Sequence, residues 1–253
     1  MLHIDYFDLI SPTPIYLQNV GHIKSPTLKE INELGINNYN YYLSPFIITK
    51  EEGFKFNGLK PQSEKISEKQ EEKLTIFDLL IYTQDGIKLL QQALNFFILE
   101  SFEFDINYNC FISKNIDGKI IGFINKNNFT DVKNYILQLN NRKDNYIYDK
   151  SEIKNEKALE IFNKINKAKE KSKKNVTVNK DLALGNIISV VANKHPSINI
   201  LNIWELTIYQ LWDTFNRLSN NNIYDISALS VAVWGDEKKQ FNISDWFKRI
   251  DNN

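Results

Sequence analysis

Three histidines and one cysteine are the residues of this chain best suited to hold a transition metal or to act as nucleophiles. His3, His22 and His195 lie far apart, and none has the spacing of a metal-binding helix pair. Cys110 lies in an apolar run with no cationic neighbour in the sequence that would lower the pKa of its thiol. We therefore expect Cys110 to be a small buried hydrophobic residue, and we predict neither a metal site nor a cofactor.

One stretch imitates the start of a calcium-binding loop. Asp105, Asn107 and Asn109 alternate as the first ligands of such a loop do. The loop needs glycine at its sixth position and glutamate at its twelfth, but Cys110 and Ile116 stand there. The calcium pattern therefore fails, and the chain also lacks the glycine-rich sequences that cradle phosphates.

Acidic pairs and one basic cluster are the remaining candidates for chemistry. The carboxylate pairs Glu51–Glu52, Glu71–Glu72 and Asp236–Glu237 lie in polar segments. An acid/base dyad needs burial to separate its two pKa values, so we expect solvated pairs and no enzyme. The basic cluster K-A-K-E-K-S-K-K at 167–174 lacks the interleaved aromatic residues that stack on bases. A solvated helix end or linker is therefore favoured over a nucleic-acid contact.

The overall composition is that of a folded protein without a strongly charged partner. The 253 residues are 42% hydrophobic and 25% charged, which excludes global disorder, and their formal net charge is zero. The first residues, M-L-H-I-D-Y-F-D-L-I, carry two aspartates and do not resemble a signal peptide, and no apolar run is long enough to span a membrane. We expect a cytoplasmic protein with no membrane partner.

Helical patterns dominate the first half of the chain. Ser25 is expected to cap a helix that ends at Gly35, and N-N-Y-N-Y-Y-L-S-P follows it as a second helix. Residues 50–74 are turn-rich and charged, and predict an exposed loop or solvated helix. Thr75 caps the apolar block T-I-F-D-L-L-I-Y; Asp85-Gly86 then interrupts it, and a strongly apolar helix continues to about residue 102.

A β-hairpin is the one convincing β unit. Asp117-Gly118 separates N-C-F-I-S-K from K-I-I-G-F-I-N, which is a strong hairpin signal. Thr130 is then expected to cap a helix with Val132, Ile136 and Leu139 on one side. We predict a mainly α (α+β) fold: a multi-helix domain with one inserted β-hairpin around residues 104–126.

Composition divides the chain into three regions. Residues 1–140 form an N-terminal helical region that carries the hairpin. Residues 141–180 are rich in Lys, Asn and Glu and predict a charged helix, with an apolar stripe through about residue 168, and a linker. Residues 181–253 form a Trp-rich helical region.

The stretch N-I-W-E-L-T-I-Y-Q-L-W-D-T-F-N-R-L at 202–218 carries the densest aromatic pattern. Asn202 and Glu205 have the spacing of a capping box. One broad apolar face follows, made of Trp204, Ile208, Leu211, Trp212, Phe215 and Leu218. We expect this face to pack on the next helix, whose matching stripe is Ile226, Leu229 and Val233, with part of the surface facing a partner.

The last segment, N-I-S-D-W-F-K-R-I at 242–250, predicts a helix of about two turns capped by Asn242. Its apolar face is Ile243, Trp246, Phe247 and Ile250. So short a helix is unstable alone and must dock. Folding back onto its own domain is favoured over gripping a partner, because a free apolar tail invites aggregation.

Several of these stretches together resemble bacteriophage tail assembly proteins of Gram-positive hosts, particularly the tail assembly chaperone type. They are S-P-T-L-K-E-I-N-E-L-G-I-N-N-Y-N-Y-Y-L, T-I-F-D-L-L-I, I-I-G-F-I-N-K-N-N-F-T-D-V-K-N-Y-I-L-Q-L-N, the Trp-rich stretch, A-V-W-G and I-S-D-W-F-K. They are patterns of spacing and aromatic placement and cover about half of the chain.

The resemblance implies a non-enzymatic role in virion morphogenesis, in the bacterial host cytoplasm during assembly. The protein would bind tape measure and/or tail tube proteins, and an oligomer is compatible with that role. The alternative is a structural component of the particle, a tail or baseplate protein that stays in the virion. The predicted partner-binding residues are Leu206, Tyr209, Trp212, Trp234, Trp246 and Phe247.

Overall fold

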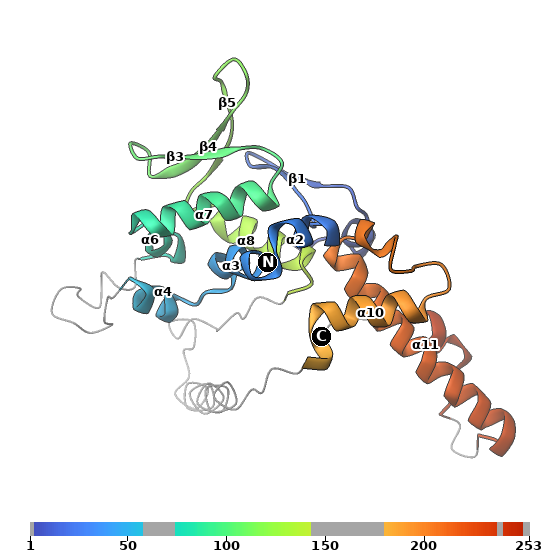
Figure 1. Cartoon of the computed structure of the whole chain (residues 1–253). Coiled ribbons are helices and arrows are strands. Elements are labelled where there is room, and N and C mark those ends of the chain that lie inside the picture. Colours follow the sequence, from blue (N-terminus) through green and yellow to red (C-terminus); the bar gives the residue numbers. More distant parts are fainter. Residues whose placement is uncertain (1–2, 58–73, 143–179, 237–239, 250–253) are drawn as a thin grey trace, which may run out of the picture.

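The computed structural model describes residues 3–57, 74–142, 180–236 and 240–249 (Figure 1). Helices dominate, with one sheet of two strands and one of three, which confirms the predicted mainly helical α+β fold. Most of the charged region predicted at 141–180, with its apolar stripe and basic cluster, lies outside the described residues, as does the charged stretch at 58–73.

The elements follow one another along the chain. The α-helices are α1 (Tyr6–Ile10), α2 (Leu28–Leu34), α3 (Ile36–Ile47), α4 (Lys50–Phe56), α6 (Ile76–Leu80), α7 (Gln84–Phe97), α8 (Phe129–Leu139), α10 (Leu184–Lys194) and α11 (Ile208–Trp234). The 3-10 helices are η2 (Lys180–Leu182), η3 (Ile203–Glu205) and η4 (Ile243–Phe247). The strands are β1 (Ile15–Leu17), β2 (Gly21–Ile23), β3 (Phe102–Asp105), β4 (Cys110–Lys114) and β5 (Ile120–Ile124).

The helix starts follow cap chemistry, although the capping residue is not always the predicted one. Thr75 and Asp78 form the capping box of α6, which confirms the predicted start. The cap of α2 is Thr27 and not Ser25, because Glu30 lies at the third helical position of a box that begins at Thr27. The cap position of α8 is Asn128, so Thr130 lies inside that helix.

The predicted break between the two helices is confirmed, but it lies at residues 81–83 and not at Asp85-Gly86. These two residues form the first turn of α7, and Thr83 accepts a hydrogen bond from the Gly86 N–H. The helix also ends at Phe97, earlier than predicted, because the Asn95 side chain accepts from the Phe102 N–H at 2.7 Å and draws the chain into β3.

The predicted hairpin is confirmed and belongs to a larger sheet. The strands β4 and β5 pair antiparallel across the Asp117-Gly118 turn, where Gly118 adopts a positive φ of 78°. β3 adds a third antiparallel strand, and the sheet stands on one side of the helical body (Figure 1).

The lead-in at 12–24 forms a second hairpin, β1–β2. It joins the larger sheet through the Phe123 N–H, which donates to the Asn19 carbonyl at 2.8 Å.

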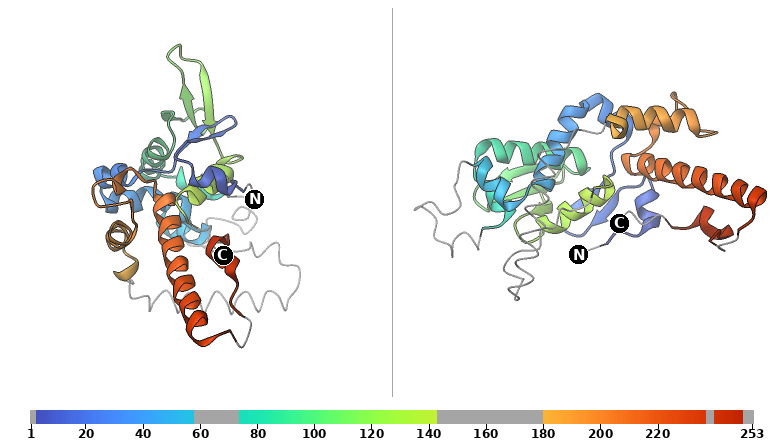
Figure 2. Two further views of the ribbon diagram at one scale, coloured as in Figure 1. Left: turned by 90° about the vertical axis from the view of Figure 1, so that its right-hand side faces the viewer. Right: turned by 90° about the horizontal axis from the view of Figure 1, so that it is seen from below.

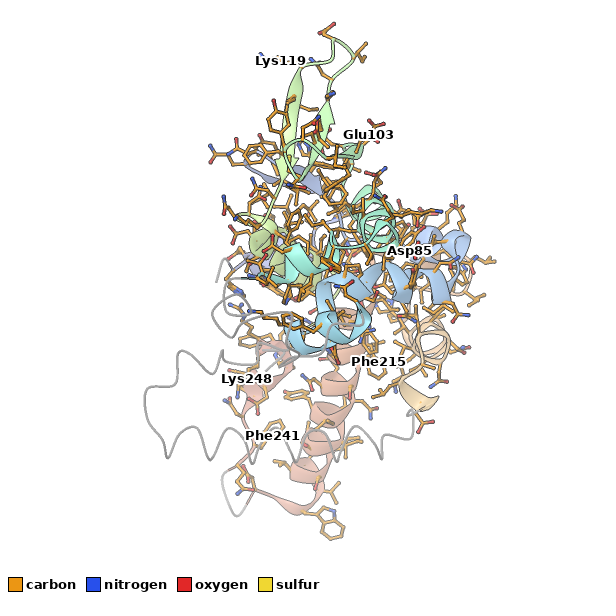
Figure 3. The ribbon with its side chains drawn as sticks, turned by 90° about the vertical axis from the view of Figure 1, so that its left-hand side faces the viewer. Asp85, Glu103, Lys119, Phe215, Phe241 and Lys248 are labelled. Atoms are coloured by element: carbon orange, nitrogen blue, oxygen red, sulfur yellow. The ribbon has the colours of Figure 1, made fainter. Side chains whose placement is uncertain are left out.

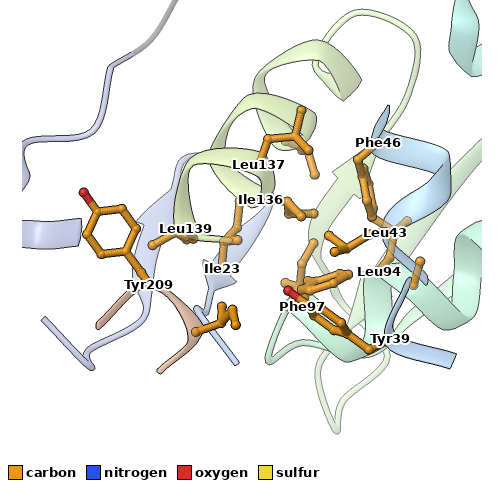
Figure 4. Close-up of a cluster of buried hydrophobic side chains, with 14 of the residues drawn as sticks. Ile23, Tyr39, Leu43, Phe46, Leu94, Phe97, Ile136, Leu137, Leu139 and Tyr209 are labelled. Atoms are coloured by element: carbon orange, nitrogen blue, oxygen red, sulfur yellow. The ribbon is translucent and has the colours of Figure 1, made fainter. Parts of the chain in front are cut away.

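One hydrophobic core joins the helices (Figure 4). Phe46 of α3 packs edge-on against Phe97 of α7 at 5.8 Å between ring centroids, and both are fully buried. On α8, the predicted face of Val132, Ile136 and Leu139 is buried against them. The core extends to the first turn of α11, whose Leu211 is fully buried.

Candidate interaction surface

The long helix α11 is the element that sets up a candidate binding surface. Its start differs from the prediction: Asn202 makes no side-chain cap, and the capping box consists of Thr207 and Gln210. The reason lies elsewhere in the chain. The Leu28 N–H donates to the Leu206 carbonyl and the Ile208 N–H donates to the Pro26 carbonyl, both at 2.9 Å. These bonds hold residues 206 and 207 extended, so α11 begins only at Ile208.

The two segments predicted as separate helices are one helix of 27 residues. The aromatic face therefore cannot pack on the stripe of Ile226, Leu229 and Val233, and that prediction is wrong. The proximal half of α11 instead contacts α10 and α1. Trp212 and Phe215 are half-buried against the common core, with their rings perpendicular at 6.1 Å.

A polar cluster fixes the proximal half of α11 to the N-terminus. The Tyr6 hydroxyl donates to Asp213 Oδ1 at 2.9 Å, and Arg217 Nη2 donates to the same hydroxyl at 2.8 Å. Gln210 Nε2 donates to the Ile10 carbonyl at 2.8 Å. Contacts from α1 therefore reach two turns of α11 and set the direction in which the helix leaves the body.

The distal half of α11, residues 219–234, extends away from the body (Figures 1 and 2). We call it the distal arm. Four apolar side chains on it are more than half exposed: Ile223 (59%), Ile226 (61%), Leu229 (67%) and Val233 (67%). The arm ends in Trp234, which is 80% exposed. Isolated exposed apolar residues are ordinary, but a contiguous stripe of them marks an interaction site.

The six predicted partner-binding residues fall into two groups. Tyr209 is buried and therefore cannot face a partner; burial, together with the nearby Asp213 carboxylate, raises the pKa of its hydroxyl to about 12. Leu206 and Trp212 are half-buried against the core. Trp234, Trp246 and Phe247 are exposed, and only these three remain available to a partner.

The C-terminal segment, residues 240–249, runs back beside the arm (Figure 2). The Asp236 carboxylate accepts from the N–H groups of Gln240 (3.0 Å) and Phe241 (2.9 Å). The Phe241 ring contacts the Tyr224 ring at 5.4 Å. At the other end of the segment, the Arg249 guanidinium lies 5.7 Å from the centre of the Tyr6 ring.

Between these attachments the segment leaves its apolar side chains outside. Asn242 caps the segment as predicted, accepting from the Ser244 N–H, but the turn it starts is the 3-10 helix η4 and not a two-turn α-helix. Ile243, Trp246 and Phe247 are 72%, 57% and 59% exposed. The segment therefore follows its own domain, but its apolar face is not docked there.

An open groove of about 990 Å³ lies between the arm and this segment. Figure 3 shows Phe241 and Lys248 on the side of the groove opposite the distal part of α11. The arm contributes the apolar side chains Ile223, Ile226 and Trp234, with the small polar Ser227 and Ser230 between them. The segment and the turn before it contribute Asp236, Asp245, Lys248 and Arg249. The groove therefore has a mainly apolar wall and a charged wall. The groove was not predicted, because Ile226 and its neighbours were expected to lie in a helix–helix contact.

The residues first considered for chemistry have structural partners. The His22 ring lies 2.7 Å from a carboxylate oxygen of Glu100, and His195 Nδ1 accepts from the N–H groups of Ser197 and Ile198. Cys110 is buried, as predicted, and burial raises the pKa of its thiol. Asp105 accepts from the Asn107 N–H in the turn after β3.

Among the residues that the structure describes, no three His, Cys, Asp or Glu side chains come together in a way that could hold a metal ion. Within the same ranges, no helix is long and apolar enough to cross a membrane.

Comparison with known proteins gives one match. Residues 168–251 match the YomV second domain, a family derived from a Bacillus prophage, and this range is about a third of the chain. The match supports a phage protein without specifying a tail assembly chaperone. It contains the whole of the arm, the whole of the C-terminal segment, and the groove between them. No curated protein and no solved structure matches the chain.

Proposed function

We propose that this chain is a non-enzymatic phage tail morphogenesis factor that binds tape measure and/or tail tube proteins in the host cytoplasm during assembly. The observation that carries the proposal is the groove: its apolar and charged walls both lie within the residues that match a phage-derived family. The resemblance of the sequence to tail assembly proteins supports the choice of partner.

The dimensions of the groove suit a helix. Its lining residues on α11 run from Asn220 to Trp234, which corresponds to about 21 Å of helix at 1.5 Å per residue. Divided by that length, the groove volume of about 990 Å³ gives a mean cross-section of roughly 50 Å². This is about half the cross-section of a helix with its side chains, which is about 10–12 Å in diameter. A partner helix would therefore lie half-sunk, with its apolar face on the arm, as amphipathic helices do in grooves.

The charges of the groove favour one direction for that helix. Lys248 and Arg249 lie toward the body, where Arg249 meets Tyr6, and Asp236 lies at the far end beyond Trp234. The C-terminus of a helix carries partial negative charge and its N-terminus partial positive charge. A bound helix is therefore most stable antiparallel to α11, with its C-terminus near the two basic residues.

Co-expression with the tape measure protein of the same phage tests the proposal. We expect the chain to co-purify with that protein and to increase its soluble fraction. The double variant I223D/W234D, at two exposed apolar residues that line the groove, should lose both effects. Ile116→Asp is the matched control, because it places the same charge on a fully exposed apolar residue at the hairpin tip. No co-purification of the unmodified chain with the tape measure or tail tube protein would contradict the proposal.

Mass spectrometry of purified particles distinguishes the assembly factor from the alternative, a tail or baseplate component. Absence of the chain from finished particles is expected of an assembly factor. Stoichiometric presence would instead identify a structural component that uses the same surface permanently.

A further inference from the structure

Part of the distal arm lies outside the groove. With 3.6 residues per turn, Ile226, Leu229 and Val233 lie at i, i+3 and i+7 and form one stripe. Tyr224, Ser227 and Val231 lie roughly on the opposite side of the helix and line the groove, whereas Leu229 and Val233 do not. The arm therefore has two faces, and Ile226 and Ser230, which also line the groove, lie at their boundary.

The stripe of Ile226, Leu229 and Val233 continues a face that is buried closer to the body. Leu211, Phe215 and Leu218 lie on the same side of α11 and pack against the core to which Ile187 and Val191 of α10 belong. Lys194, the last residue of α10, donates to the Asn222 side chain at 3.2 Å. Beyond that contact the stripe continues without cover, with Leu229 and Val233 each 67% exposed.

We propose that this stripe pairs with the same stripe of a second copy of the chain, as an antiparallel pair of arms about a two-fold axis. The axis would pass between Leu229 and Ser230. Ile226 then faces Val233 of the partner subunit, and Leu229 faces Ser230 of the partner subunit. The same patch meets itself, as in most homodimers.

Charge favours a second copy over a different partner. Asp225 is the sole charged residue between 219 and 234, and it lies about 100° around the helix from Ile226. A stripe without charges offers a different protein no ion pair that would fix its register, whereas two such stripes meet without like-charge repulsion. The opposed helix dipoles also favour the antiparallel arrangement.

The exposed area suits a weak dimer. The exposed parts of Ile226, Leu229 and Val233 amount to roughly 350 Å² of apolar surface in each copy. Two copies together therefore bury on the order of 700 Å², the size of a weak and reversible association. The arm projects from the body, so the two bodies lie apart when the arms pair (Figure 2).

Sedimentation of the purified full-length chain, alone, tests the proposal independently of any tail protein. We expect the sedimenting mass to rise with concentration toward twice the monomer mass of 29.7 kDa, with a substantial dimer fraction at about 300 µM, since an interface of this size is weak. The double variant L229E/V233E should sediment as a monomer with an unchanged circular dichroism spectrum, because both side chains are exposed. Ile116→Glu, the control, should remain dimeric. A monomeric wild type, or a dimeric double variant, overturns the proposal.

Cysteine cross-linking tests the register without removing an apolar contact. Ser230→Cys places two thiols beside the two-fold axis, so mild oxidation should convert most of that variant to a covalent dimer. The control Ser219→Cys lies on the same helix, but its two copies would be about 30 Å apart, far beyond disulfide reach. Cys110 is buried and does not interfere. Equal cross-linking of the two variants, or none at Ser230→Cys, excludes the antiparallel pair.

Discussion

Tyr6 and Asp213 are 207 residues apart in the sequence and share a hydrogen bond of 2.9 Å. The same hydroxyl accepts from Arg217, and both Arg217 and Arg249 lie 5.7 Å from the Tyr6 ring centre. One side chain of α1 therefore contacts both α11 and the end of the C-terminal segment. This contact holds the two walls of the groove in place relative to the body.

Removing that hydroxyl should weaken the attachment of α11. Tyr6→Phe keeps the ring and its contacts with both guanidinium groups but loses the bonds to Asp213 and Arg217. Because these bonds involve charged groups at a partly exposed site, we expect a loss of about 1–2 kcal/mol in the free energy of unfolding. Urea denaturation measures it. Tyr108→Phe, at a ring that is 74% exposed, is the control and should change stability little.

The cap of α11 should be a second stabilising point. The buried Thr207 hydroxyl accepts from the Gln210 N–H, and Gln210 Oε1 accepts from the Thr207 N–H. Thr207→Ala should therefore cost about 1–2 kcal/mol of stability in thermal or chemical denaturation. Thr214→Ala removes the same atoms from the helix interior, where alanine is the better helix former, and should be neutral or slightly stabilising. Equal losses in the two variants would contradict the assigned cap.

A pair of glycine substitutions tests the contact between the two hairpins. A Cβ added at Gly122 would lie 2.4 Å from the Val20 carbonyl oxygen, and backbone on both sides leaves little room to move. We expect Gly122→Ala to destabilise the protein by about 1–3 kcal/mol. A Cβ at Gly185 in α10 meets open space, so Gly185→Ala should stabilise by about 0.5–1 kcal/mol. Melting temperatures of the two variants should therefore move in opposite directions.

Acid should weaken the contact between β2 and Glu100, which lies two residues before β3. Burial acts to raise the pKa of Glu100, but hydrogen bonds from the His22 ring and backbone N–H outweigh it and lower that pKa below its usual value. A carboxylate with a lowered pKa stabilises the fold above its unfolded pKa of about 4.3, and this stabilisation is lost as pH falls through the folded pKa. The stability difference between wild type and Glu100→Gln should therefore shrink as pH falls below about 4.

Local signals were enough to predict much of the body. Asp117-Gly118 fixed the hairpin because the type of turn depends on the turn residues themselves, and Thr75 with Asp78 fixed a helix start in the same way. Local signals alone could not predict the start of α11. Asn202 and Thr207 both begin a capping-box pattern, and hydrogen bonds to residues about 180 positions away decide between them.

The groove was unpredictable for a related reason. Periodicity shows which side of a helix is apolar but not what covers that side. The stripe of Ile226, Leu229 and Val233 looks the same in sequence whether it is buried or exposed. Its exposure follows from two facts of three-dimensional structure: α11 continues through Ser219–Asn222, and α10 ends beside Asn222. Of the six predicted partner-binding residues, the three in the last 20 residues of the chain are the exposed ones.

Deleting residues 240–253 should separate stability from partner binding. No side chain at 240–249 is buried, and the segment is held by the Phe241–Tyr224 contact, the bonds to Asp236 and the Arg249–Tyr6 contact. We therefore expect a loss of only about 1–2 kcal/mol in the free energy of unfolding. Binding to the tape measure protein should fall to background, because the deletion removes the charged wall of the groove together with Trp246 and Phe247. Sedimentation should still show paired arms, since the stripe of Ile226, Leu229 and Val233 is intact. Global unfolding of the truncated chain would show that the segment belongs to the core, and unchanged partner binding would show that the groove is not the binding site.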